Sequence, residues 1–117
     1  MQVTAIGWAG TRTGADGAMV EFLTTVLGLT VAHQEQGVTA LELPSGERFE
    51  VFGPDDDDHR YFTTGPVVGF VVRDLPAAVA ELERAGVELL GGHVDQGGGG
   101  WRHFRAPDGN VYELTSG

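Results

Sequence analysis

The stretch PDGNVYEL at residues 107–114 repeats, in register, the earlier stretch PSGERFEV at residues 44–51. Proline, glycine, an aromatic residue, glutamate and an aliphatic residue recur at a constant offset of 63 residues. Pro-Ser-Gly and Pro-Asp-Gly are turn sequences, so each stretch is predicted to form the tip and outgoing strand of a β-hairpin. Gly28 and Gly86 also end two predicted helices at matching places. The chain is therefore interpreted as two copies of one module.

Two helices are predicted from apolar periodicity and from their terminal residues. The first spans residues 15–27, with Asp16 as its expected N-cap and Gly28 after its end. The second spans residues 74–85 and has Pro76 in its first turn. The apolar stripe expected to face the core in the first helix consists of Met19, Phe22, Leu23 and Val26.

Short β-rich segments surround these helices. They cover residues 3–8, 29–33, 38–43, 48–52, 67–72, 87–90, 101–105 and 111–114. The order is β-α-β-β-β twice, which predicts an α+β fold built from two βαβββ modules in a single domain over residues 1–117. The first module covers about residues 1–53 and the second about residues 66–117. The polar linker between them, about residues 54–65, is expected to stay out of the core.

Composition excludes several classes of function. The chain has 117 residues with 7 Lys+Arg against 17 Asp+Glu, a formal charge of −10. Nucleic-acid binding requires the opposite sign, whereas a cationic or neutral small ligand fits this charge. Cysteine is absent, which removes disulfides and thiolate chemistry. With no long apolar run and no export leader, we expect a cytoplasmic protein without a membrane partner.

Two glutamates occupy equivalent places in the repeat. Glu50 and Glu113 alternate with apolar neighbours and therefore point to the same face of their half-sheets. A three-residue hairpin turn pairs His103 with Glu113 and leaves Trp101 on the same face. Turn chemistry explains why the proline and the glycine are repeated, but it does not explain the repeated glutamate. The repeated glutamate therefore favours a shared pocket. The alternative is that each glutamate is a solvated carboxylate at a strand end.

These features together resemble the vicinal-oxygen-chelate superfamily, which includes glyoxalase I, extradiol dioxygenases, fosfomycin-resistance enzymes and bleomycin-resistance proteins. The segments that carry the resemblance are residues 21–29, 70–75 and 107–114. The resemblance implies a cupped mixed β-sheet and a homodimer whose sheets complete a cavity. It implies little about activity, because one fold hosts many chemistries.

The resemblance also implies a divalent metal held by the first and last strands of each module. Glu50 and Glu113 match the last-strand positions, but Trp8 and Val67 occupy the first-strand positions and cannot ligate a metal. We therefore expect no cofactor. The predicted function is metal-independent binding of a small aromatic or cationic molecule, as in the bleomycin-resistance type. The predicted ligand-binding residues are Trp8, Glu50, Phe62, Trp101 and His103.

Two enzymatic alternatives remain open. In one, Glu50, His103 and Glu113 hold a divalent metal ion that serves a lyase, isomerase or dioxygenase reaction. In the other, His103 and Glu113 act as catalytic residues in acid–base chemistry without a metal. His33, His59 and His93 fall in or near predicted loops and receive no predicted role.

Overall fold

The computed structural model describes residues 1–63 and 65–117, and its elements follow the predicted order of two βαβββ modules. The remaining residue, Thr64, belongs to the predicted linker and lies outside the described residues. The first module consists of β1 (Val3–Arg12), α1 (Asp16–Thr25), β2 (Thr30–Glu35), β3 (Val38–Glu42) and β4 (Arg48–Phe52). The second consists of β5 (Val67–Val72), α2 (Leu75–Arg84), β6 (Glu88–Val94), β7 (Gly100–Arg105) and β8 (Val111–Thr115).

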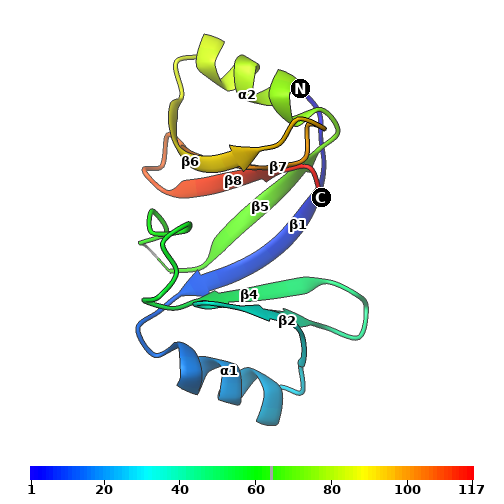
Figure 1. Cartoon of the computed structure of the whole chain (residues 1–117), viewed down its shortest axis with the longest axis vertical. Coiled ribbons are helices and arrows are strands. Elements are labelled where there is room, and N and C mark those ends of the chain that lie inside the picture. Colours follow the sequence, from blue (N-terminus) through cyan, green and yellow to red (C-terminus); the bar gives the residue numbers. More distant parts are fainter. Residues whose placement is uncertain (64) are drawn as a thin grey trace.

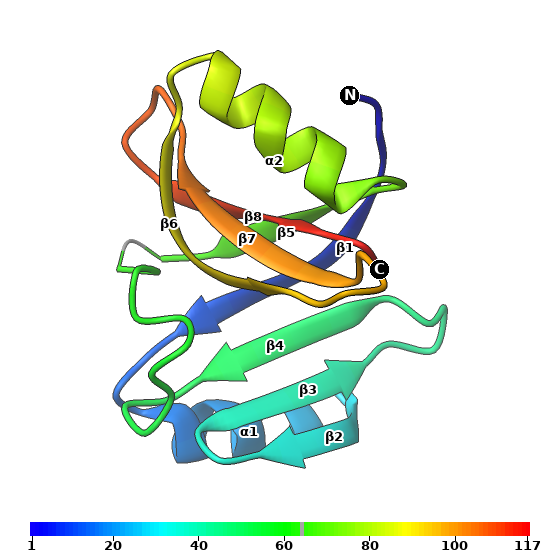
Figure 2. The ribbon, with the colours of Figure 1, turned by 45° about the horizontal axis from the view of Figure 1, so that its top comes forward.

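All strands join one curved mixed sheet in the order β2-β3-β4-β1-β5-β8-β7-β6. Within each module the first strand runs parallel to the last, β1 to β4 and β5 to β8. The modules meet where β1 pairs antiparallel with β5. Helices α1 and α2 lie at opposite ends of the molecule, and the sheet curves between them (Figures 1 and 2). This arrangement confirms the predicted α+β fold with a cupped mixed sheet.

The register of the last hairpin is also confirmed. The Ala106 N–H donates to the Asn110 carbonyl (2.9 Å), which closes the turn. His103 therefore pairs with Glu113, and Phe104 packs with the cluster beneath α2. Turn chemistry and side-chain alternation thus place the histidine and the glutamate on the same face.

Helix α1 departs from the prediction at both ends. Its N-cap is Ala15, and Asp16 stands in the first turn without capping the helix by its side chain. The buried face is centred on Leu23, whereas Phe22 and Val26 are 46% and 67% exposed. Val26 lies outside because the helix ends at Thr25, and Phe22 is turned about 100° around the helix from Leu23. The expected stripe is therefore wrong at these two positions.

The linker packs more closely than expected. Asp56 is 4% exposed, and its carboxylate accepts hydrogen bonds from the His59 N–H (3.1 Å) and from Arg12 (3.4 Å). Gly37, at φ +77°, makes room for it, because an added Cβ would lie 2.7 Å from the Asp55 carbonyl carbon. A buried aspartate with several donors is a stable arrangement, so the expectation that the linker stays out of the core is wrong.

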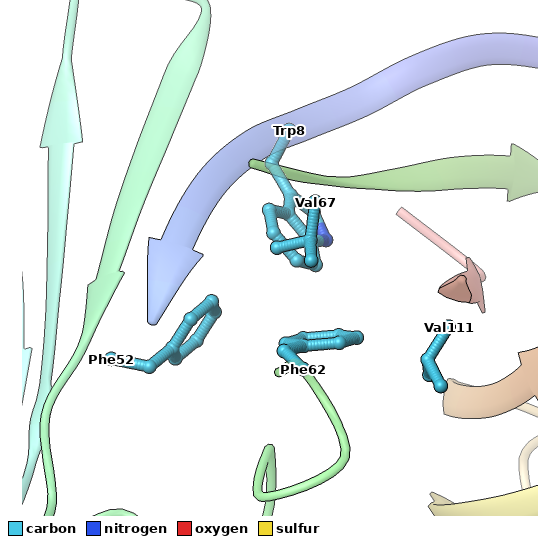
Figure 3. Packing of buried hydrophobic residues seen from close by; sticks show 5 residues of the cluster. All are labelled: Trp8, Phe52, Phe62, Val67 and Val111. Atoms are coloured by element: carbon cyan, nitrogen blue, oxygen red, sulfur yellow. The ribbon is translucent and has the colours of Figure 1, made fainter. Parts of the chain in front are cut away.

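A central apolar cluster joins the two modules to the linker. Its buried members are Trp8, Phe52, Phe62, Val67 and Val111 (Figure 3). The Trp8 ring lies 5.5 Å from the Phe52 ring and 5.9 Å from the Phe62 ring. Gly69, its cross-strand partner on β5, has no side chain to obstruct the indole. The aromatic cluster therefore depends on a glycine at position 69.

Neither helix in the described part of the chain combines the length and the apolar character needed to cross a lipid bilayer.

Candidate functional site

A cavity of about 550 Å³ opens on the sheet and receives side chains from both modules. Glu50 on β4 and Glu113 on β8 line it, together with Trp101 on β7. His59 of the linker and Trp8 on β1 also line it. The repeat therefore brings the two glutamates together in one cavity.

The two glutamates share a poorly solvated environment. Burial and the nearby charge of Glu50 raise the pKa of Glu113 to about 8, while a hydrogen bond with Trp8 opposes this shift. Burial also raises the pKa of Glu50, against the favourable charges of His59 and Arg48. Glu113 therefore holds its proton at neutral pH more firmly than an ordinary glutamate. An incoming cation would favour loss of that proton.

His103 lies beneath the cavity floor and is fully buried. Burial, with a further contribution from His59, lowers its pKa to about 4. Neither ring nitrogen has a hydrogen-bond partner among the described residues. Its Nε2 lies 3.9 Å from Oε2 of Glu113, beyond hydrogen-bonding distance. The cross-strand pair predicted from the sequence is therefore present without a direct hydrogen bond.

His59 is the site residue that sequence reasoning missed. Its Nδ1 lies 3.0 Å from the Asp56 carboxylate, its ring stacks on Phe52 at 4.2 Å, and it lies 5.4 Å from the His103 ring. Since a carboxylate only accepts, Nδ1 carries a proton, and in the neutral ring Nε2 is then left with its lone pair. The signal was the spacing of Asp56 and His59 three residues apart in a loop, where a side chain can bond back to the backbone.

The other predicted ligand-binding residues take different positions. Trp101 forms part of the cavity wall, with its ring 6.1 Å from that of His59 and nearly parallel to it. Phe62 is 1% exposed and lies behind the cavity, where its ring is 4.7 Å from that of His103. Trp8 is mostly buried in the central cluster. The aromatic surface open to a ligand is thus provided chiefly by Trp101.

The chain has two βαβββ modules joined through β1 and β5, with glutamates on β4 and β8, and its sequence matches a known family model. The profile of the Glyoxalase/Bleomycin resistance protein/Dioxygenase superfamily covers residues 5–114. The chain belongs to this superfamily. No curated protein sequence matches the chain.

Solved structures with the superfamily fold resemble the chain along nearly its whole length. Methylmalonyl-CoA epimerase from Mycobacterium tuberculosis is 21% identical, with a TM-score of 0.72 over 97% of this chain and 87% of that one. The Streptomyces coelicolor epimerase, as a variant bound to 2-nitronate-propionyl-CoA, is 22% identical, with a TM-score of 0.70 over 97% and 96%. A superfamily member from Vibrio splendidus 12B01 is 15% identical, with a TM-score of 0.66 over 92% and 94%. These TM-scores establish a shared fold and, at such low identity, nothing beyond it.

The metal position implied by the superfamily resemblance does not fit the side chains of this member. Trp8 and Val67 stand at the two first-strand positions and pack together in the central apolar cluster. An indole and an isopropyl group offer no ligand atom to a divalent ion. We therefore assign no chemistry to a metal held by the first and last strands.

Proposed function

We propose that this superfamily member binds a small, flat, cationic or neutral molecule in the cavity between its two modules. The observation that carries the proposal is the combination of one aromatic wall with two facing carboxyl groups. Trp101 supplies the flat apolar surface, and Glu50 and Glu113 supply the polar anchors. A concave site with an apolar wall and a few convergent polar groups is typical of small-molecule binding.

The charge around the cavity supports a cation over an anion. Besides Glu113, which holds its proton at neutral pH, four lining residues carry carboxyl groups, namely Glu35, Glu50, Asp56 and Asp58. Among the described lining residues, Arg48 is the one with a permanent positive charge. A cavity walled by one sign of charge concentrates ligands of the opposite sign and repels those of the same sign.

Acid–base catalysis is a second candidate function, favoured by the pKa of Glu113. A carboxyl group whose pKa is raised to about 8 exchanges its proton near neutral pH, and Glu50 faces the same cavity. His103 would assist once its Nε2 approached Glu113 more closely than the present 3.9 Å. Such an enzyme needs the same binding site, so binding is the first property to test.

Replacing Trp101 by alanine is expected to weaken binding of a flat cation by about 1–3 kcal/mol, the range measured for bases stacked on aromatic side chains. The probe is N-methylacridinium, titrated by calorimetry into protein kept in EDTA. Phe22→Ala is the matched control, because Phe22 is an exposed aromatic residue on α1, away from the cavity. Equal affinity in wild type and Trp101→Ala would remove the indole from the binding site.

The homodimer stays a prediction. It is supported by apolar side chains exposed around the end of α1, where Val26 and Leu27 are 67% and 56% exposed. Ile6 on β1 is also exposed, at 66%. Exposed apolar residues that adjoin one another, as Val26 and Leu27 do, favour contact with another protein surface.

A further inference from the structure

Three metal-binding side chains from separate parts of the chain lie close together, two of them lining the cavity and one buried beneath it. Each of the three side chains offers one possible ligand atom, and these atoms all lie within 4.8 Å of one another; the residues are His59, His103 and Glu113. His59 comes from the linker, His103 from β7 and Glu113 from β8. A metal ion at ligand distances of about 2.0–2.2 Å would require these atoms to approach by small side-chain movements.

His103 provides an independent reason to expect a ligand here. Its side chain is fully buried, yet neither nitrogen has a hydrogen-bond partner among the described residues. A buried polar group without a partner costs roughly 1–3 kcal/mol. One edge of the ring, at Nε2, faces Glu113 across 3.9 Å. A cation between them would satisfy that nitrogen.

His59 has the support that metal-binding histidines commonly have. Asp56 accepts from its Nδ1 (3.0 Å) and is itself held by the Arg12 guanidinium, which also donates to the Asp56 carbonyl (3.1 Å). A carboxylate behind a ligating histidine fixes the tautomer and the ring orientation. Asp56 and Arg12 therefore hold His59 with Nε2 free to bind.

We propose that His59, His103 and Glu113 form a binding site for a divalent transition-metal cation such as Zn²⁺, with Asp56 as the residue that positions His59. Two imidazoles and one carboxylate suit zinc or iron, whereas calcium and magnesium prefer oxygen ligands. His59 and Glu113 line the cavity, so the open coordination position would face it. The site shares Glu113 with the metal position implied by the resemblance, but takes its two histidines from elsewhere.

Titration of metal-free, untagged protein with Zn²⁺ against a chromophoric chelator tests the site. We expect one Zn²⁺ per chain. His59→Gln should weaken its affinity by at least about 100-fold, and Asp56→Asn by about 10- to 100-fold, the range seen for residues behind metal ligands. The control is His93→Gln, since His93 is an exposed histidine outside the cavity, and it should stay within about twofold of wild type.

The coordination of the bound metal can be measured separately from its affinity, by absorption spectroscopy. Co²⁺ in place of Zn²⁺ should give visible absorption of a low-symmetry site, and this spectrum should be lost in Glu113→Gln. Because His103 and Asp56 are both buried, His59→Gln is the variant expected to keep the fold, and circular dichroism checks the fold of every variant.

Absence of stoichiometric Zn²⁺, or wild-type affinity in His59→Gln and Glu113→Gln, would overturn the proposal. Loss of binding with His33→Gln instead would also overturn it, because His33 pairs with Glu35 at the surface (2.7 Å). Because the probe is the metal ion alone, a failure to bind Zn²⁺ would not contradict the proposed small-molecule binding. Equally, a failure to bind a small molecule in EDTA would not contradict the metal site.

Discussion

Gly69→Ala is expected to lower the free energy of unfolding by about 3 kcal/mol, the upper end of the usual cost of overpacking a core. An added Cβ at position 69 would lie 2.7 Å from Cε2 of the Trp8 indole. Trp8 cannot retreat, because Phe52 and Phe62 pack against its ring. Urea-induced unfolding, followed by tryptophan fluorescence, measures the change.

Gly17→Ala is the matched control for this substitution. Gly17 lies in α1, and an added Cβ there meets nothing within 4 Å. The exchange should raise stability by about 0.5–1 kcal/mol, because alanine favours the helix more than glycine does. A neutral or stabilising effect of Gly69→Ala would show that the Trp8 indole does not lie over β5.

In EDTA, the free energy of unfolding is expected to fall by about 1 kcal/mol between pH 6.5 and 8, less than the limiting slope for one proton of about 1.4 kcal/mol per pH unit. The folded protein holds the Glu113 proton up to a pKa of about 8, whereas the unfolded chain loses it near 4.5. Between pH 4.5 and 6.5 the fall in stability caused by Glu113 is offset by His103. His103 binds a proton in the unfolded chain but not in the folded protein, where its pKa is about 4. Denaturant unfolding across this pH range measures the slope.

Glu113→Gln should abolish the decline between pH 6.5 and 8, because glutamine does not titrate. Its stability should instead rise from pH 4 to 6.5, where the effect of His103 is partly opposed by the raised pKa of Glu50, and should change little above that range. Glu83→Gln is the control: Glu83 is exposed on α2, and the variant should keep the wild-type slope. Identical pH profiles for wild type and Glu113→Gln would contradict the raised pKa.

The repeat accounts for what the sequence predicted well. Side-chain alternation and turn length are local properties, so they place Glu50 and Glu113 on one face and His103 beside Glu113. Duplication then brings the two glutamates into one cavity. These inferences needed no knowledge of distant contacts.

The linker accounts for what the sequence did not show. Residues 54–65 have no counterpart in the repeat, and the path of residues 54–63 depends on distant partners. Arg12 at the end of β1 donates a hydrogen bond to Asp56. Gly37 in the β2–β3 turn has no side chain, which lets the backbone of Asp55 and Asp56 approach closely. With the linker held in this way, His59 lies in the cavity wall and Phe62 lies in the core. Neither position can be predicted from periodicity or composition.

The central claim, that the cavity binds a small cationic or neutral molecule, is tested most directly by comparing two flat probes of opposite charge. Calorimetric titration of EDTA-treated protein at pH 7 would measure the affinities of N-methylacridinium and anthracene-9-carboxylate. We predict that the cation binds at least about tenfold more tightly, since juxtaposed like charges cost several kcal/mol, and that Glu50→Gln reduces this preference. Equal or tighter binding of the anion, or no saturable binding of either probe, would contradict the account.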